Sequence, residues 1–127
     1  RGWVDGDAAE YYEAAIRESF DYMEVDQDEF QDYYEQASVD LAQAADKIER
    51  IIGQKWLALN SISSIEAWND YRRLGFPDIP NSLDAPTPTS RPLRFMYPET
   101  ERMTNNTEAS RVGSDDMLTA RVWWDPQ

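Results

Sequence analysis

The chain has 127 residues and no cysteine or histidine, with 25 acidic against 12 basic residues and a formal net charge of −13. The lack of cysteine excludes disulfides, thiolate catalysis and Cys-based metal sites, and the lack of histidine removes the commonest general base and metal ligand. Because nucleic acids and anionic lipids are bound through Lys and Arg, the acidic balance disfavours both as direct partners.

Acidic residues are concentrated in the first part of the chain. Residues 1–50 carry 15 acids and 4 bases, a net charge of −11, whereas residues 51–127 carry 10 acids and 8 bases, a net of −2. Such a charge run is typical of a solvated helical face. The length is that of one domain or less. No apolar run approaches the roughly 20 residues of a membrane span.

The first predicted helix spans about residues 8–23. Asp7, with Glu10 three residues later, is typical of a helix N-terminus, because a capping side chain accepts hydrogen bonds from the first free backbone amides. Apolar side chains three or four residues apart predict one apolar helix face, formed by Ala8, Tyr12, Ala15, Ile16, Phe20 and Met23.

A short helix is predicted at about residues 29–36, within an acidic and aromatic stretch. Asp26 and Asp28 resemble the start of a calcium-binding loop. An EF-hand loop would then need a third oxygen ligand and a glycine, but Phe30 and Gln31 occupy those places. We therefore predict a solvated loop here and no metal site.

The next predicted helix is the longest, at about residues 39–60, with Ser38 as its cap. Residues three or four apart along this stretch are apolar, which indicates one face of a helix. The members of this face are Leu41, Ala45, Ile48, Ile52, Trp56 and Leu59.

A further helix is predicted at residues 63–74. Ser63 and Glu66 have the spacing of a capping box, Gly75 supplies a left-handed exit, and Pro77 prevents continuation. Because only a short turn separates this helix from the one before, we expect the two to lie antiparallel as an αα-hairpin.

The remainder of the chain is rich in proline. Six of the seven prolines lie between Pro77 and Pro98, so we expect extended coil with turns that packs along the helices. Short helical turns are predicted from Pro98 to Met103 and from Asn106 to Gly113. Adjacent tryptophans cannot share one face of a helix or strand, so we expect one of those at positions 123 and 124 to be buried and the other exposed.

Aromatic residues are frequent, with five Trp and seven Tyr in the chain. Exposed rings could stack on a sugar, but Tyr33 and Tyr34 are predicted to be half-buried packing residues. Trp56 and Trp68 lie on apolar helix faces and are predicted to belong to the core. No ligand-binding residue is therefore assigned.

Several of these segments together resemble the C-terminal signature of SusD/RagB-like proteins, which are surface lipoproteins of Bacteroidota that capture nutrients, mostly glycans. The ordered set covers most of the chain, and a visible departure is Leu74, where threonine is more frequent. The matching segments are residues 6–19, 54–59, 66–68, 70–77, 92–101, Asn105 and 122–125.

The resemblance implies a structural role for a defined set of residues. Arg72 and Arg73 could bind a carboxylate or sugar hydroxyl through the guanidinium fork. We favour the alternative, in which one arginine ties the helix to Glu101 or Asp70. The signature residues are Gln54, Lys55, Trp56, Glu66, Trp68, Tyr71, Arg72, Arg73, Gly75, Pro77, Arg94, Tyr97, Pro98, Glu101 and Asn105.

The predicted fold class is mainly α. Residues 1–75 are expected to form an antiparallel helical, tetratricopeptide-like hairpin layer, and residues 76–127 an irregular proline-rich segment that wraps over it, both in one structural unit. Because family members are several times longer, the resemblance implies that this chain is only the C-terminal part of a longer protein.

The implied function is glycan binding at the cell surface of the outer membrane, with a SusC-like TonB-dependent β-barrel as partner and an oligosaccharide as ligand. The only membrane contact expected is a lipid anchor outside this chain, and no catalytic residue, metal or cofactor is predicted. An alternative is a helical module that binds a protein partner, which an exposed apolar groove would favour. A glycosidase using paired carboxylates is the least favoured option, because 25 acids make some pair always available.

Overall fold

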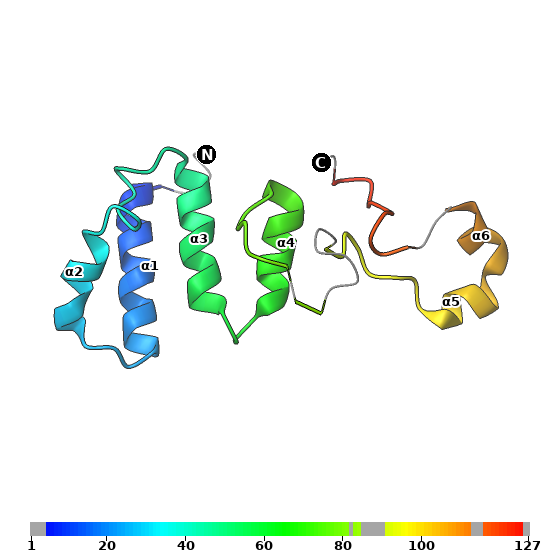
Figure 1. The fold of residues 1–127 in the computed structure, drawn as a ribbon, viewed down its shortest axis with the longest axis horizontal. Coiled ribbons are helices and arrows are strands. Elements are labelled where there is room, and N and C mark those ends of the chain that lie inside the picture. Colours follow the sequence, from blue (N-terminus) through cyan, green and yellow to red (C-terminus); the bar gives the residue numbers. More distant parts are fainter. Residues whose placement is uncertain (1–4, 82, 85–90, 113–115, 126–127) are drawn as a thin grey trace. The chain divides into compact units, whose positions relative to one another are not determined.

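The structure is a computed structural model that describes residues 5–81, 83–84, 91–112 and 116–125. Over these residues it contains helices and turns and no strand, which confirms the mainly α prediction. The chain divides into two compact units, Arg1–Pro77 and Asp78–Gln127. The first unit holds α1 to α4 and the second α5 and α6 (Figure 1). No helix in the described ranges is both long and apolar enough to cross a membrane.

Helix α1, Ala8–Tyr22, begins and ends through local backbone chemistry. The Asp7 side chain accepts a hydrogen bond at 3.0 Å from the backbone N–H two residues later, which confirms the predicted cap. At the other end, Glu24 adopts a left-handed φ of 55°, and the N–H of Val25 donates to the carbonyl of Phe20 at 2.9 Å. This is a Schellman ending, with a glutamate in the position that glycine usually takes.

The predicted helix at residues 29–36 is shorter and partly of the 3₁₀ type. A 3₁₀ turn spans Gln27–Glu29, and helix α2 spans Phe30–Tyr34. The carboxylate of Asp26 accepts a hydrogen bond at 3.0 Å from the backbone N–H of Asp28. Asp26 therefore acts as a local cap at this turn.

Helix α3, Lys47–Leu59, starts eight residues later than predicted, so the expected helix from residue 39 with Ser38 as its cap is wrong. Its N-cap is Asp46, whose carboxylate accepts from the N–H groups of Ile48 and Glu49 at 2.7 and 3.2 Å. One carboxylate thus satisfies two of the free amides of the first turn.

The segment before α3 is turned because it contributes to the core. Val39 and Leu41 are 3% and 4% exposed. The carbonyl of Val39 accepts the hydroxyl proton of Tyr12 at 2.6 Å. The apolar spacing of this segment fits a helix. The chain instead forms a turn, which buries Val39 and Leu41 and lets the Val39 carbonyl accept the hydrogen bond from Tyr12.

Helix α4, Ser64–Leu74, has the predicted bounds to within one residue. Ser63 is the N-cap but makes no side-chain capping bond, so the predicted capping box is wrong. Gly75 has a φ of +79° and its N–H donates to the carbonyl of Tyr71 at 2.7 Å, which confirms the left-handed exit.

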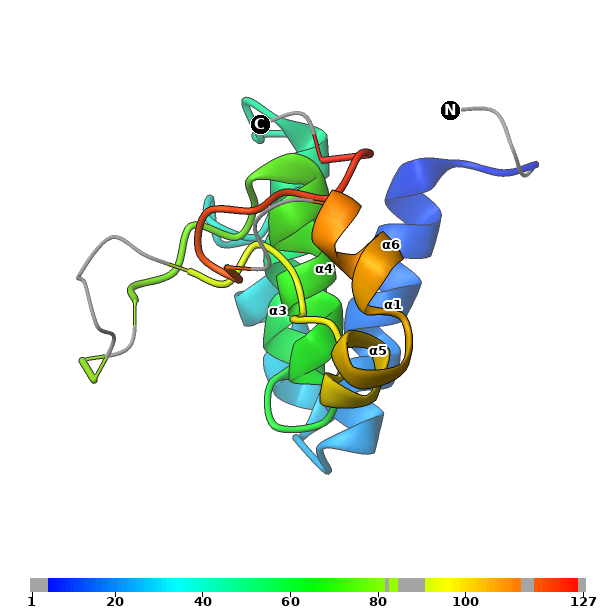
Figure 2. The same cartoon turned by 90° about the vertical axis from the view of Figure 1, so that its right-hand side faces the viewer.

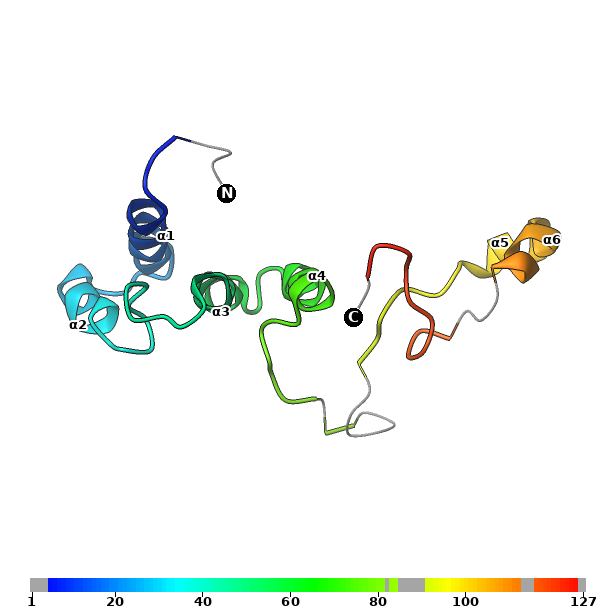
Figure 3. The ribbon, with the colours of Figure 1, turned by 90° about the horizontal axis from the view of Figure 1, so that it is seen from above.

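The helices of the first unit form a layer. Viewed from above in Figure 3, α1, α3 and α4 are seen nearly end-on, so their axes run roughly parallel. Figure 1 shows α3 and α4 as the predicted antiparallel hairpin, whereas α1 and α3 run in the same direction. The tetratricopeptide-like character of the layer stays a prediction.

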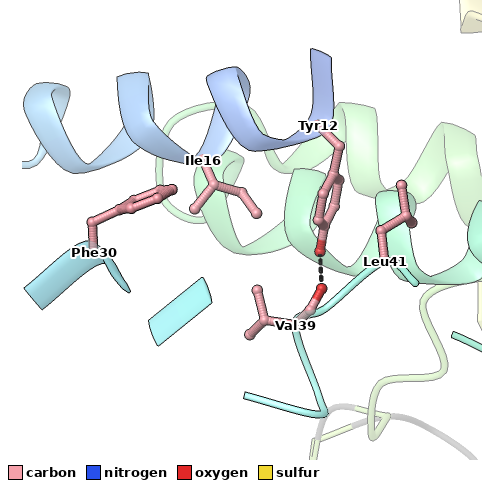
Figure 4. Close-up of a cluster of buried hydrophobic side chains, with 5 residues drawn as sticks. All are labelled: Tyr12, Ile16, Phe30, Val39 and Leu41. Carbon is pink, nitrogen blue, oxygen red and sulfur yellow. Dashed lines mark hydrogen bonds between the residues drawn. The ribbon is translucent and has the colours of Figure 1, made fainter. Parts of the chain in front are cut away.

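An aromatic core lies between α1, α2 and the turn before α3 (Figure 4). It consists of Tyr12, Ile16, Phe30, Val39 and Leu41, all at most 6% exposed. We call these five residues the core cluster. Phe20, Tyr33 and Tyr34 pack against it while partly buried, which confirms the packing prediction for the two tyrosines.

In the second unit, α5 spans Glu99–Thr104 and α6 spans Asn106–Arg111, with a bend between them (Figure 2). Pro98 is the N-cap of α5, so the helix begins one residue later than predicted, and Asn105 is the N-cap of α6, which begins at Asn106 as predicted. The predicted end at Gly113 lies outside the described residues.

The pair of tryptophans near the end of the chain does not behave as predicted. Trp123 is 94% exposed and Trp124 is 42% exposed, so neither ring is buried and the expectation of one buried ring is wrong. The backbone here follows a turn, in which the alternation of a strand or the periodicity of a helix does not apply. The packing of the proline-rich segment along the helices stays a prediction.

Candidate functional site

A buried carboxylate, Asp70 of α4, is the centre of the polar contacts between α3 and α4. Asp70 is 5% exposed. Its Oδ2 accepts from Lys55 Nζ at 2.7 Å, and its Oδ1 accepts from Arg73 Nη2 at 2.7 Å. Lys55 Nζ also lies 3.4 Å from Glu66 Oε2. We call Lys55, Glu66, Asp70 and Arg73 the charge cluster.

The contacts within the charge cluster keep Asp70 and Lys55 ionised. Burial raises the pKa of Asp70, but the hydrogen bonds from Lys55 and Arg73 outweigh this effect and hold that pKa below its usual value. The hydrogen bond to Asp70 raises the pKa of Lys55 against the opposing effect of its own partial burial. Each charge stabilises its partner, so the cluster joins α3 to α4 and is not poised to transfer a proton.

The two neighbouring arginines have different contacts. Arg73 pairs with Asp70 one helical turn away, and Asp70 is one of the two partners predicted for an arginine here; the structural role of the pair stays a prediction. The guanidinium of Arg72 lies 3.8 Å from the centroid of the Trp68 ring, and its Nη2 donates to Asn69 Oδ1 at 2.8 Å. Such stacking combines a cation–π contact with burial of the indole face.

The other signature residues of the first unit support the helix packing. Gln54 Oε1 accepts from the hydroxyl of Tyr33 at 2.9 Å, which links α3 to α2. Trp56 and Trp68 are half-buried, which is less than the core position predicted for them. Pro77 is the last residue of this unit.

Signature residues of the second unit also contact one another. The guanidinium of Arg94, which is 9% exposed, lies 4.4 Å from the centroid of the Tyr97 ring. Asn105 Nδ2 donates to Glu101 Oε1 at 2.6 Å, and the carbonyl of Pro98 accepts from the N–H of Glu101 at 2.9 Å. These contacts hold the start of α5 and its junction with α6.

Each unit also contains a hollow. The second unit has a cavity of about 540 Å³ whose walls include Tyr97, Arg102 and Asn106. The first unit has a groove of about 990 Å³ between α1 and α3, lined mainly by apolar side chains. We call it the α1–α3 groove. Among the described residues, no group of three or more acidic side chains is placed to hold a metal ion.

Sequence reasoning missed the central position of Asp70 and the groove. The pairing of Asp70 with an arginine was among the predictions, and it has the i, i+3 spacing of neighbours on a helix. The contact of Asp70 with Lys55 joins residues 15 apart in the chain, across the hairpin, and no local pattern shows it. The groove was missed because helical periodicity shows which residues share a face without showing what covers that face.

Comparisons with known proteins agree with this arrangement. A SusD-like family model, described as "Starch-binding associating with outer membrane", matches residues 1–98. A SusD homologue from Bacteroides fragilis is 32% identical with a TM-score of 0.77, and the match covers 98% of this chain and 31% of that one. A SusD-like protein of the Bacteroidetes is 28% identical with a TM-score of 0.72, covering 99% and 27% respectively.

No curated protein matches the chain. The chain spans less than a third of the length of the two solved SusD-like proteins, and the similarity extends over nearly all of its own residues. The order of helices α1 to α4 and their capping residues lie within the region that the family model matches. The chain therefore belongs to the SusD-like family.

Proposed function

We propose that the protein containing this chain binds glycans at the cell surface and passes them to a SusC-like TonB-dependent transporter in the outer membrane. The observation that carries the proposal is the match of residues 1–98 to a family described as starch-binding and associating with the outer membrane. The likeness to two solved SusD-like structures over nearly the whole chain supports the same function.

Within that protein, we propose that residues 1–127 act mainly as scaffold. The charged side chains of the signature are engaged with one another, as in the pairs of Asp70 with Lys55 and Arg73. The guanidinium of Arg72 is stacked on Trp68. Groups that are held in this way stabilise the helix packing and are not free to rearrange around a sugar.

We further propose that the protein binds its ligand without breaking a bond and that a lipid anchor outside residues 1–127 holds it on the outer membrane. The sequence lacks the His and Cys residues of nucleophilic catalysis. Asp70, the buried carboxylate of the charge cluster, is committed to ion pairs in which it stays ionised.

Purification of the partner tests this function. The whole protein, tagged at its C-terminus, is captured from detergent-solubilised outer membrane, and we expect a large β-barrel protein to be retained with it. A glycan screen that starts with soluble starch, as the family description suggests, then identifies the ligand. Recovery of the protein alone, from the soluble fraction, would contradict the proposal.

The α1–α3 groove supports a second candidate function, a helical module that binds another protein. The same capture experiment separates the two candidates. Retention of a soluble protein in place of a β-barrel, together with no binding to any glycan in the screen, would favour the protein-binding module.

A further inference from the structure

The cavity of the second unit lies along α5 and α6, the two short helices that Figure 2 shows on either side of a bend. We call it the α5–α6 cavity. Its walls come from separate segments of this unit, since Tyr97 precedes α5 and Asp116 follows α6. The volume of about 540 Å³ lies within the range of roughly 300–1,000 Å³ that is usual for small-ligand sites.

The walls of this cavity combine apolar surface with several kinds of polar group. The apolar lining residues are Met96, Tyr97 and Ala109. A guanidinium, an amide, a hydroxyl and a carboxylate are supplied by Arg102, Asn106, Ser110 and Asp116. The cavity therefore offers both hydrogen-bond donors and acceptors beside an aromatic ring.

The aromatic ring at the cavity, Tyr97, is held in place by a buried arginine. The guanidinium of Arg94 lies 4.4 Å from the centroid of the ring, and Arg94 is 9% exposed. Its Nε donates to the carbonyl of Phe95 at 2.9 Å, which fixes the arginine in turn. A ring positioned in this way presents a flat apolar surface to a ligand at little further cost in ordering.

Asn106 provides an amide at the start of α6. Its Oδ1 accepts a long hydrogen bond of 3.4 Å from the hydroxyl of Ser110, one turn further along the helix. The amide nitrogen makes no hydrogen bond within the part of the chain that the structure describes. A ligand acceptor in the cavity can therefore receive a hydrogen bond from this group.

Asp116 provides a carboxylate with a fixed orientation. Its Oδ1 accepts from the N–H of Leu118 at 2.9 Å, and its Oδ2 accepts from the hydroxyl of Thr119 at 2.8 Å. These two hydrogen bonds hold the pKa of Asp116 below its usual value, so it stays ionised. Each carboxylate oxygen can accept a second hydrogen bond from a ligand hydroxyl.

The chemistry of the walls favours a neutral ligand with many hydroxyl groups. Sugar hydroxyls both donate and accept hydrogen bonds, and the C–H face of a sugar ring matches an aromatic surface. An anionic ligand would meet the carboxylate of Asp116 and the net charge of −13 on this chain. A purely apolar ligand would remove polar wall groups from water without replacing their hydrogen bonds.

We propose that the α5–α6 cavity binds a neutral oligosaccharide. The sugar ring packs against Tyr97, and its hydroxyls form hydrogen bonds with Asn106 and Asp116. This inference rests on the proposed glycan-binding function and gives the second unit a part in it. The hydrogen-bonding side chains of the cavity lie outside the signature set, so the scaffold role and the sugar site use different polar groups.

A thiol placed at the cavity reports whether a sugar occupies it in the whole protein. Ser110 lines the cavity and Thr107, on the same helix, does not, and both are exposed. Maleimide labelling of Ser110→Cys and Thr107→Cys is measured with and without maltoheptaose, cellohexaose or mannohexaose. We expect at least one sugar to slow labelling of Ser110→Cys by about fivefold, as mass action gives at about four times the Kd. Labelling of Thr107→Cys should stay unchanged, and the unsubstituted protein gives the background.

Removal of one contact tests the proposed hydrogen bond. In the Ser110→Cys protein, Asn106→Ala should raise the sugar concentration for half-protection by roughly threefold to tenfold, as the loss of one hydrogen-bonding group predicts. Thr107→Ala in the same protein is the matched control and should leave this concentration unchanged. Protection that survives Asn106→Ala at the same sugar concentration would overturn the role of this amide.

The labelling pattern also decides whether the site exists. Labelling of Ser110→Cys that no sugar slows overturns the proposal, and so does equal slowing of both thiols. A Ser110→Cys thiol that is inert without sugar shows that another part of the protein fills the cavity, which overturns it as well. Retention of a β-barrel in the capture experiment, together with an unprotected thiol, rejects this site alone and leaves the proposed function in place.

Discussion

The core cluster and the charge cluster hold the same unit together by opposite means. In the core cluster, Phe30 is 1% exposed, stacks on Tyr34 with ring centroids 5.5 Å apart, and meets Phe20 edge to face at 5.7 Å. In the charge cluster, Asp70 is buried to a similar extent but is held by two cations. The first joins α1 and α2 through apolar area, and the second joins α3 and α4 through hydrogen-bonded charge.

The difference concerns what each cluster gains from burial. Burial of aromatic area is favourable in itself and roughly proportional to the area removed from water. Burial of a carboxylate is unfavourable until charge-assisted hydrogen bonds offset it, so the gain depends on geometry. We therefore expect the apolar cluster to provide most of the stability and the charged cluster to fix how the two helices pair.

Phe30→Ala should have the largest effect. Removal of a fully buried ring leaves a cavity, and such substitutions cost about 3–5 kcal/mol in the free energy of unfolding. Denaturant unfolding of the whole protein measures the loss. Tyr22→Ala, which removes an aromatic ring that is 70% exposed on α1, is the control and should cost far less. Equal losses for the two variants would contradict the central place of Phe30.

Asp70→Ala should come next, with a loss of about 1–3 kcal/mol in the free energy of unfolding. The substitution leaves Lys55 without its closest partner, but both cations are partly exposed and can regain water. Retention of full stability would show that the cluster is not needed for helix pairing. Glu108→Ala, which breaks an exposed pair with Arg111, is the matched control and should have little effect.

The contribution of Asp70 should also depend on pH in a defined direction. Because its pKa is lower in the folded state than in the unfolded chain, its stabilisation is complete at neutral pH and is lost as the pH falls through the folded-state value. The stability difference between the natural protein and Asp70→Asn should therefore shrink below about pH 4. A difference that stays constant from pH 7 to pH 3 would contradict this linkage.

Tyr12→Phe tests a polar contact inside the apolar cluster. The loss of the 2.6 Å hydrogen bond leaves the Val39 carbonyl buried without that donor, which should cost about 1–2 kcal/mol in the free energy of unfolding. Burial also raises the pKa of Tyr12 to about 12. Because the neutral phenol is favoured in the folded state, its contribution is complete below about pH 10 and is lost as the pH rises toward 12. The variant should lose less stability than the natural protein over that range.

Arg73→Ala should have the smallest effect, below about 1 kcal/mol, because its side chain is 51% exposed and Asp70 keeps Lys55 as a partner. Glycan affinity per folded molecule should stay unchanged if the arginine is structural. Thermal unfolding and glycan titration of the whole protein measure the two quantities. A melting temperature equal to that of the natural protein would count against any structural role, and a selective loss of glycan affinity would assign Arg73 to ligand binding.

Helix ends with short-range chemistry were predictable. The cap at Asp7 and the left-handed exit at Gly75 each involve a backbone group within four residues, so the sequence pattern contains both partners. The start of α3 was not predictable in this way. Ser38 and Asp46 are both good N-caps, and the choice between them depends on the contact of Tyr12 with Val39, 27 residues away.

Prediction from the sequence reaches the same limit in the charge cluster. The predicted capping box places Glu66 back toward Ser63, but its side chain lies near Lys55 instead. The Glu66 carboxylate could accept a hydrogen bond either from the backbone at the start of α4 or from Lys55 on α3, two interactions of similar strength. Only the antiparallel packing of α3 against α4 decides between these two partners.

Sequence patterns alone predicted the helical class, most helix ends and the family, because these depend on periodicity, on caps and on motifs whose residues are close together. Three features became visible only in the folded chain: Val39 and Leu41 are buried in the core, Asp70 joins two helices, and Tyr11 lines an open groove. These features depend on packing between segments that are distant in the sequence. The packing free energy comes from many residues together, and no local sequence pattern shows which of them will be in contact.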